Sequence, residues 1–324
     1  PALKLDGVIG SSAMFSALRL LNPQSETVRM KHLVNILMAP VAVLRLVLLV
    51  TIVLIGGLAM VLLAPIPIRL RGIRLAAWPQ VAMARSALVV GNVWVRCDDR
   101  RALRAHEGLV FPNHLSFVDI AILLSIVPVR FMATQGVAKL PVIGWLATMI
   151  GTVYVNRGSD RGRAQARQEA GEALKREPYP PLASFAEGGI GPGDQVLPLR
   201  HGAFGLAAEH GLGIRPVAIA YDPLAIARWE KPTSLWRVMW RIASFPGPLR
   251  VRVTPLPEVR PAPGDDLPAL ASATQEALAG TLGVPAGTVR HEVIRKQLGA
   301  WTLGNGAPAN GVQHDDEVAT EPSA

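Results

Sequence analysis

The chain has 324 residues, of which 50% are hydrophobic and 18% charged, and its mean hydropathy is +0.31. This composition excludes a disordered chain and favours association with a membrane. Lysine and arginine outnumber aspartate and glutamate by 33 to 24, so an acidic partner is expected. Because aromatic residues make up only 5%, anionic lipid is favoured and no nucleic-acid partner is expected. The single cysteine, Cys97, excludes an intramolecular disulfide and a cysteine-based zinc cluster.

The first third of the chain predicts a region attached to a membrane. Residues 1–32 form an irregular or amphipathic lead-in, and residues 33–95 form a membrane-associated helical region. Within it, Leu46–Ile68 carries no charged residue and is long enough to cross a hydrocarbon core of about 30 Å as a helix. Gly56-Gly57 and nearby prolines also permit a re-entrant hairpin, and basic residues on both flanks leave the orientation of a spanning helix open. A second apolar helical stretch is predicted over Leu75–Val95.

Residues 96–285 alternate short apolar runs with helical stretches, a pattern typical of an α/β domain whose sheet has covered faces. The expected strands are Gly108–Phe111, Val129–Ala133, Thr152–Val155, Leu182–Phe185, Arg215–Ala220 and Leu249–Thr254. The expected helices are Ser116–Ile126, Arg161–Lys175, Ala203–Glu209 and Leu267–Leu282. Residues 286–324 are predicted to form a C-terminal extension with a disordered tail, because glycine, asparagine and acidic residues are frequent there.

The segment Phe111–Asp119 places a histidine and a carboxylate at a strand-to-helix turn. On a continuous helix, a spacing of five residues would rotate Asp119 by about 140° from His114. If His114 instead lies in the turn and Ser116 caps the helix, Asp119 sits at the third helical position and points back toward the imidazole. Such a carboxylate would orient His114 while the histidine removes a proton from an alcohol. A structural interpretation is also open, because Ser116 to Asp119 is a capping-box pattern.

Two later segments suggest contacts with a ligand. Gly151–Arg157 is a short β-prone run that ends in a basic residue, and an arginine at a strand end can hold a phosphate bidentately. Phe185–Gly193 places Glu187 between an apolar strand and a glycine-rich loop, which permits close approach of the backbone to a ligand. Each segment taken alone also fits a solvated arginine or an ordinary flexible turn.

The remaining polar residues add little. The other histidines show no metal-ligand spacing, so no metal site is predicted. Trp229, Trp236 and Trp240 are interleaved with basic residues, and this stretch fits either an interfacial lipid contact or a packed surface helix.

Taken in order, the polar segments resemble the motifs of the glycerolipid acyltransferase family. The family's first motif, N-H-x-x-x-x-D, is met by Asn113, His114 and Asp119. Its second, G-x-x-[FY]-[IV]-x-R, is met by Gly151, Tyr154, Val155 and Arg157. Its usual stretch between these two motifs is matched by Lys139, Pro141 and Gly144.

The third motif of the family, F-P-E-G-T, is met only in part, by Phe185, Glu187 and Gly188. Proline and threonine are replaced by Ala186 and Gly189, and Ile190 stands where members that form phosphatidic acid often carry an arginine. Further on, Leu197–Phe204, which contains Arg200, resembles the family's L-P-F-K-x-G-A-F. The resemblance covers roughly residues 105–255.

The resemblance implies an α/β fold with a central mixed sheet flanked by helices, like that of glycerol-phosphate acyltransferases, behind an N-terminal membrane-embedded helical segment. It implies transfer of a fatty acyl chain from acyl-CoA or acyl-carrier protein to the free hydroxyl of 1-acyl-glycerol-3-phosphate, which forms phosphatidic acid in phospholipid biosynthesis. No cofactor beyond this co-substrate is expected. The expected partners are membrane lipid, a lysophospholipid acceptor and an acyl thioester donor, and the expected location is the membrane, with the active site facing the cytoplasm.

The resemblance also assigns roles to single residues. It implies that His114 is the general base and that Asp119 orients it. It implies contacts with substrate for Asn113, Lys139, Arg157, Glu187, Gly188 and Arg200. The irregular third motif keeps lysophosphatidylcholine or lyso-ornithine lipid open as the acceptor. A lipid-binding pseudoenzyme is the alternative from another class, and the intact His114, Asp119 and Arg157 argue against it.

Overall fold

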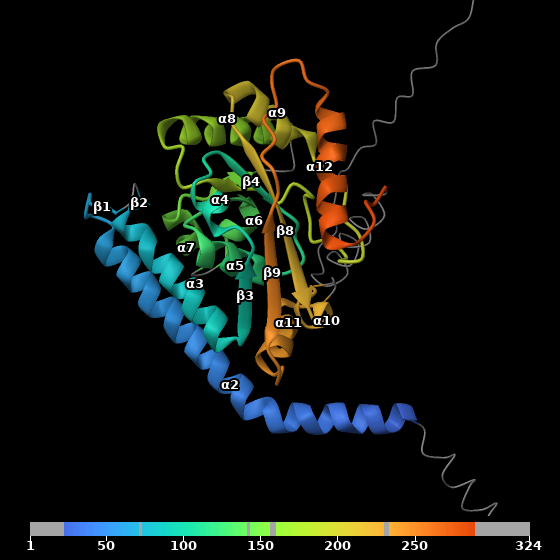
Figure 1. The fold of residues 1–324 in the computed structure, drawn as a ribbon. Coiled ribbons are helices and arrows are strands. Elements are labelled where there is room, and N and C mark those ends of the chain that lie inside the picture. Colours follow the sequence, from blue (N-terminus) through green and yellow to red (C-terminus); the bar gives the residue numbers. More distant parts are fainter. Residues whose placement is uncertain (1–22, 71–72, 141–142, 156–159, 230–232, 289–324) are drawn as a thin grey trace, which may run out of the picture.

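A computed structural model describes residues 23–70, 73–140, 143–155, 160–229 and 233–288 of the protein. At its centre lies a seven-stranded sheet in the order β3-β9-β8-β4-β7-β5-β6 (Figure 1). The strands are β3 (Val93–Cys97), β4 (Leu109–Pro112), β5 (Arg130–Thr134), β6 (Val153–Val155), β7 (Leu182–Ala183), β8 (Ile214–Asp222) and β9 (Leu249–Pro255). Neighbouring strands are parallel except β8 and β9, which are antiparallel. The expected mixed sheet is therefore confirmed.

Helices cover both faces of this sheet. Along β4, Leu109 and Phe111 join the core on one face and Val110 joins the core on the other, because successive side chains of a strand point in opposite directions. The Val110 face is covered by α3 (Trp78–Val90), α4 (Arg100–Arg104), α5 (Val118–Ile126), α10 (Leu224–Ala227) and α11 (Leu235–Ala243). The Leu109 face is covered by α8 (Asp160–Arg176), α9 (His201–His210) and α12 (Leu267–Leu282). Two short helices, α6 (Gln135–Ala138) and α7 (Ile143–Met149), connect β5 to β6.

The six predicted strands all form, as β4 to β9, but β3 was not predicted. The apolar stretch Leu75–Val95 was expected to be helical throughout, whereas α3 ends at Val90 and β3 begins at Val93. Asn92 adopts a φ of 53° there, a left-handed conformation that a helix does not continue through and that asparagine tolerates well. The sheet therefore begins inside the region 33–95 that was predicted to be membrane-associated.

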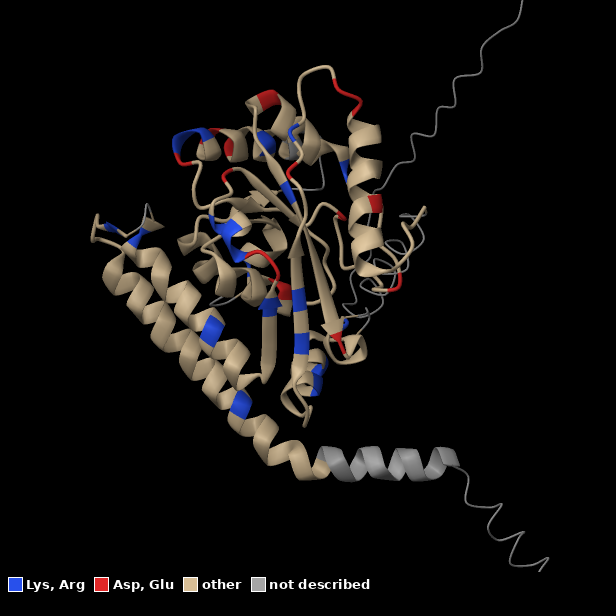
Figure 2. Ribbon diagram, viewed as in Figure 1, with Lys and Arg blue, Asp and Glu red and all other residues tan. Residues whose placement is uncertain are grey.

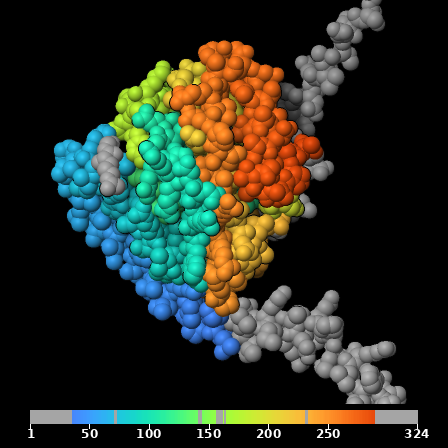
Figure 3. All heavy atoms as spheres, in the orientation of Figure 1, coloured from blue at the N-terminus to red at the C-terminus, as the bar shows by residue number. Residues whose placement is uncertain are grey.

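An N-terminal arm lies along one side of the α/β body (Figures 1 and 3). It consists of α2 (Pro23–Leu63), the two-stranded hairpin β1 (Arg69–Leu70) and β2 (Ile73–Arg74), a 3₁₀ turn at Leu75–Ala77, and α3. A Cβ atom at Gly56 would overlap the side chain of Met83, so this glycine lets α2 and α3 approach closely. The chain reverses after α2, and α2 itself runs through Gly56-Gly57 without a break.

The arm is apolar and partly packed on the body. Ile36–Leu63 is long and apolar enough to cross a membrane, and Figure 2 shows few charged residues on the described arm. One of these charges, Arg45, donates from Nη1 to the carbonyl oxygens of Ala243 and Phe245 at 2.8 and 3.0 Å, which holds α2 against the end of α11. Other side chains of α2, such as Leu44 and Ile55, are exposed.

The basic, tryptophan-containing stretch folds partly as α11. Val238 and Ile242 of this helix are buried in the body, and Trp240 packs against the middle of α2, around Ala42 and Leu46. Trp236 is exposed by 59%. The packed-helix interpretation therefore describes most of α11, and a lipid contact stays a prediction for Trp236.

Candidate active site

The polar residues of the first and third motifs meet at one edge of the sheet. His114 follows β4, Glu187 follows β7 and Tyr221 lies near the end of β8, and these three strands are parallel. Parallel strands place their carboxyl ends at a common edge, which is where α/β proteins bind ligands. Two of the expected segments, and a third at Tyr221 that was not expected, therefore meet at this edge although they are far apart in the sequence.

His114 and Asp119 form a hydrogen-bonded pair, as the turn geometry predicted. The distance from Nδ1 of His114 to Oδ2 of Asp119 is 2.9 Å. The Asp119 side chain is fully buried, whereas that of His114 is 17% exposed. Because Nδ1 donates to the carboxylate, Nε2 is left as the acceptor that can take a proton from a ligand.

The carboxylate of Asp119 also caps the turn that carries the histidine. Its Oδ2 accepts from the backbone nitrogens of Leu115 and Ser116 at 2.8 and 2.9 Å. The Ser116 contact is half of a capping box, as the structural interpretation predicted. The same carboxylate also orients His114, so one side chain makes both kinds of contact. The helix begins later than predicted: α5 starts at Val118 with Phe117 as its N-cap, so Asp119 is its second residue.

Tyr221 completes the surroundings of Asp119 and was not predicted. Its hydroxyl donates to Oδ1 of Asp119. Burial raises the pKa of Tyr221 well above its usual value, and the charge of Asp119 raises it further. The hydroxyl therefore stays protonated and remains a donor. The predicted strand ended one residue before Tyr221, and the only available signal was a tyrosine near the carboxyl end of a predicted strand.

The imidazole ring of His114 is also held from its flat side. The ring of Phe185 stacks on it, with a centroid distance of 3.9 Å and an interplanar angle of 22°. Phe185 follows β7 and belongs to the third motif. The stacked ring and the Asp119 hydrogen bond together fix the position and the orientation of the imidazole.

Glu187 holds the backbone of the site. Its Oε1 accepts from the backbone nitrogen of His114 at 2.9 Å, and its Oε2 accepts from that of Leu197 at 3.2 Å. The residue is 1% exposed. In return, the nitrogen of Gly191 donates to the carbonyl of His114 at 2.6 Å. Glu187 thus ties the turn at His114 to the segment at Leu197, and its expected contact with substrate stays a prediction.

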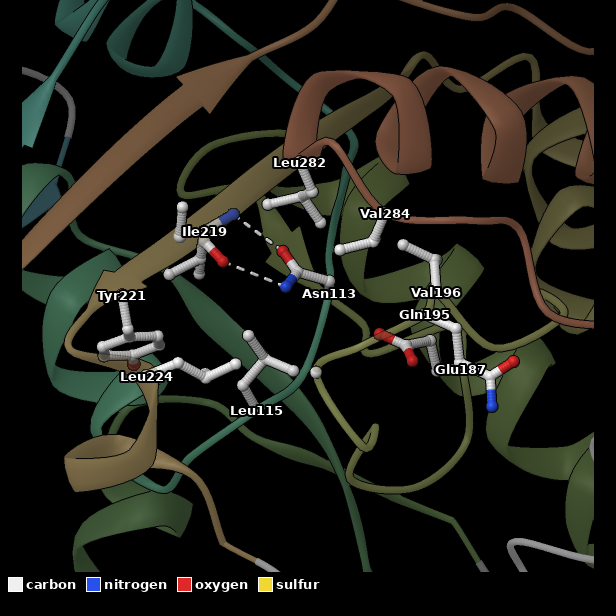
Figure 4. Close-up of a pocket in the computed structure, with 12 residues that line it drawn as sticks. Asn113, Leu115, Glu187, Gln195, Val196, Ile219, Tyr221, Leu224, Leu282 and Val284 are labelled. Carbon is white, nitrogen blue, oxygen red and sulfur yellow. Dashed lines mark hydrogen bonds between the residues drawn. The ribbon is translucent and has the colours of Figure 1, made fainter.

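Asn113 likewise ties the site to the sheet. Its Nδ2 donates to the carbonyl of Ile219 at 3.1 Å, and its Oδ1 accepts from the nitrogen of Ile219 at 2.7 Å. The side-chain amide thus pairs β8 with the end of β4 beyond their last ladder contact (Figure 4). Both polar atoms of this buried amide thus make hydrogen bonds within the protein, and the expected contact of Asn113 with substrate stays a prediction.

Of the three cationic residues expected to bind a phosphate, the structure describes Arg200 and Lys139. The guanidinium of Arg200 lies against Gly188, where a Cβ atom would overlap it, and Gly188 has a φ of +76°. Only glycine fits such a position without strain. Lys139 is exposed at the end of α6. Arg157 lies outside the described residues.

A cavity of about 170 Å³ lies beside the histidine turn (Figure 4). Polar atoms of Asn113, Glu187 and Gln195 line one part of it. The rest is mainly apolar, with side chains from β8, from the loop after Gly193 and from the end of α12. The cavity therefore has a partly polar and partly apolar wall, and it adjoins Asn113 and Glu187, the second of which contacts the backbone of His114.

Comparisons with known proteins agree with this geometry. The family model Acyltransferase matches residues 95–220. A lyso-ornithine lipid O-acyltransferase from Rhodobacter capsulatus is 32% identical over 54% of this chain and 69% of its own. A 1-acyl-sn-glycerol-3-phosphate acyltransferase from Neisseria gonorrhoeae is 27% identical over 51% of this chain and 66% of its own. These alignments thus leave about a third of each relative unmatched.

The fold also has a solved counterpart. The crystal structure of the 1-acyl-sn-glycerophosphate acyltransferase PlsC from Thermotoga maritima matches with a TM-score of 0.56 over 78% of this chain and 94% of that chain, at 20% identity. The sheet, the His114–Asp119 pair and the matching family model define an acyltransferase. By its likeness to the Rhodobacter enzyme, this chain belongs to the glycerolipid acyltransferase family.

Proposed function

We propose that this protein transfers a fatty acyl chain from an acyl thioester, acyl-CoA or acyl-carrier protein, to the free hydroxyl of a lysophospholipid. The observation that carries the proposal is the 2.9 Å contact between His114 and the buried Asp119, with Nε2 of His114 directed away from that contact. A histidine oriented in this way is suited to act as a general base on an alcohol.

The reaction proceeds without a covalent enzyme intermediate. Nε2 of His114 takes the proton of the acceptor hydroxyl while its oxygen attacks the thioester carbonyl carbon. The tetrahedral intermediate collapses with loss of the thiolate, which takes up the proton from the imidazolium. Asp119 stabilises the imidazolium between the two steps, because its carboxylate lies on the opposite ring nitrogen. An ester forms, a thioester breaks, and the histidine returns to its starting state.

The acceptor phosphate is assigned to cationic residues around the turn. Arg200 lies against the backbone of Gly188 in the third motif, so its guanidinium is near the loop that holds His114. Arg157 and Lys139 are further candidates from the motif resemblance. The cavity of about 170 Å³ beside Asn113 is a candidate space for an acyl chain. Pockets that hold a whole drug-sized ligand are usually about 300–1,000 Å³, so this smaller cavity would hold only part of the chain.

The first choice of acceptor is 1-acyl-glycerol-3-phosphate, which gives phosphatidic acid. Lyso-ornithine lipid is the second candidate, because relatives from Rhodobacter capsulatus and Brucella abortus, 32% and 34% identical to this chain, carry that activity in their names. The third motif supports this alternative. The side chain of Ile190 cannot form an ion pair with a phosphate, as an arginine at this position could. A zwitterionic amino-acid headgroup carries its own positive charge, so it depends less on such an arginine.

The apolar arm supports attachment to a membrane, where both acceptors reside. The exposed side chains of α2 would contact lipid tails, and Arg45 would keep the arm docked on the body. We place the active site on the cytoplasmic side, because acyl-CoA and acyl-carrier protein are cytoplasmic donors.

A panel assay tests the acceptor. The detergent-purified full chain is given palmitoyl and oleoyl thioesters of CoA and of acyl-carrier protein, together with lysophosphatidic acid, lysophosphatidylcholine or lyso-ornithine lipid. Selective acylation of lysophosphatidic acid supports the first choice, and selective acylation of lyso-ornithine lipid supports the second. A folded protein that binds lysolipid and acylates none of them would instead be a lipid-binding pseudoenzyme.

A further inference from the structure

A second cavity lies where the arm meets the body. We call it the seam cavity, and its volume is about 500 Å³. Its arm side is formed by Ile73, Trp78, Val81 and Arg85. Its body side is formed by the end of α4 and the segment after it, by the end of α5 and the segment after it, and by the loop before β7. These residues are Arg104, Ala105, Glu107, Ile126, Pro128 and Tyr179. This volume is in the range of small-molecule sites.

The seam cavity is separate from the catalytic site. Glu107 precedes β4 and Tyr179 precedes β7, whereas His114 and Glu187 follow these same strands. The seam cavity therefore lies at the amino edge of the parallel strands, and the His114 site lies at their carboxyl edge. A ligand in the seam cavity is accordingly neither the acceptor nor the donor at His114.

Two arginines of the seam cavity, Arg85 and Arg104, each make a hydrogen bond to the protein through Nε. Nε of Arg85 donates to the carbonyl of Ser125 at 2.9 Å, and Nε of Arg104 donates to that of Ile126 at 3.1 Å. These carbonyls belong to consecutive residues at the end of α5, so the two guanidinium groups are held at one place. Within the described chain, no hydrogen-bond partner occupies their Nη1 and Nη2 atoms. Such forked donors suit a phosphate group.

The rest of the wall suits a lipid chain. Ile73, Trp78 and Val81 give an apolar side, and they belong to the same arm whose outer surface exposes Ile55, Leu62 and Val89. We propose that the seam cavity binds an anionic membrane phospholipid, with its phosphate on Arg85 and Arg104 and an acyl chain against the arm. The exposed Glu107 is the acidic residue in this wall, and it opposes an anion there.

Fluorescence of Trp78 tests the proposal. The full chain is placed in detergent micelles that contain phosphatidylglycerol or phosphatidylcholine brominated on the acyl chains, which quench nearby tryptophans. The contribution of Trp78 is the part of the quenching that is lost in the Trp78→Phe variant. Phosphatidylglycerol is expected to quench Trp78 at lower concentration than phosphatidylcholine. The double variant Arg85→Gln/Arg104→Gln should raise the half-quenching concentration of phosphatidylglycerol by roughly tenfold or more, because each arginine supplies a charge-assisted contact.

Three comparisons make the test decisive. Arg100→Gln/Arg101→Gln removes the same charge from exposed positions of α4 outside the seam cavity and should change nothing. Glu107→Gln should strengthen quenching by phosphatidylglycerol, and it leaves the contacts with α5 intact. Inorganic phosphate in molar excess should leave the signal in place, because it has no acyl chain. Equal quenching by the two lipids, equal loss in both double variants, or complete displacement by inorganic phosphate would overturn the assignment to a lipid.

Discussion

Tyr221 near the end of β8 donates a hydrogen bond to Oδ1 of Asp119, 102 positions earlier in the chain. The other oxygen of the same carboxylate accepts from the imidazole of His114 and from two backbone nitrogens. The His114–Asp119 pair is thus anchored to the central sheet and not only to its own turn. An ionised carboxylate can accept all four of these hydrogen bonds.

Tyr221→Phe is expected to lower kcat by about tenfold, because a hydrogen bond to a charged group is worth about 1.5–3 kcal/mol and a tenfold rate change corresponds to about 1.4 kcal/mol. KM should change little, since the hydroxyl does not contact substrate in this account. Tyr154→Phe is the matched control, because its hydroxyl bonds Thr148 and Gly144 and not Asp119. Equal rate losses in the two variants would refute the positioning role.

Asn113→Asp is expected to destabilise the fold before it affects binding. The new carboxylate cannot donate to the carbonyl of Ile219, and a buried unsatisfied group costs about 1–3 kcal/mol. Denaturant midpoints of the detergent-solubilised protein measure this loss. Asn92→Asp also removes a bond to a carbonyl, that of Gly247, at a less buried site, and should cost less. An unchanged midpoint with weaker acceptor binding would return Asn113 to the substrate-binding role.

His106 makes folding stability depend on pH. Burial lowers its pKa in the folded state, while in the unfolded chain it titrates near pH 6.5. Below about pH 6.5 the unfolded state therefore binds more protons, and the free energy of unfolding falls as the pH falls. His106→Gln should remove this part of the loss between about pH 7.5 and about pH 5.5. The exposed His201→Gln serves as control, and an identical pH dependence in both variants would contradict the account.

Arg45 is expected to hold the arm to the body. Arg45→Met removes the donor to Ala243 and Phe245 and should raise amide hydrogen exchange over residues 235–245, because the end of α11 loses this contact. Thr51→Val is the control, since the Thr51 hydroxyl bonds only within α2, to the carbonyl of Val47. If exchange over these residues is the same in both variants and in the unchanged protein, the docking role is wrong.

Sequence patterns predict the parts of this structure that depend on local chemistry. Apolar runs locate six strands, and α12 has the predicted bounds because Gly283 ends it in a left-handed conformation with φ of 68°. The pairing of His114 with Asp119 follows from a turn of five residues. The order of the motifs indicates which strand ends carry polar side chains.

Contacts between distant segments could not be predicted in the same way. The Glu187 carboxylate holds the nitrogen of His114 across 73 positions, and Tyr221 reaches Asp119 across 102. Both depend on the order of strands in the sheet, which no local pattern carries. Strand β3 was missed for a different reason, because Val93 and Val95 continue the apolar character of α3 and only Gly91 and Asn92 mark the turn between them.

The most direct test of the account is acyl transfer by the detergent-purified full chain with His114→Ala beside the unchanged protein. Loss of the general base should lower the rate by about 10²-fold or more. The circular dichroism spectrum should be unchanged, because the backbone contacts of His114 with Glu187 and Gly191 do not need the imidazole. A folded His114→Ala protein that retains most of its transfer activity would contradict the assignment of His114 as the base.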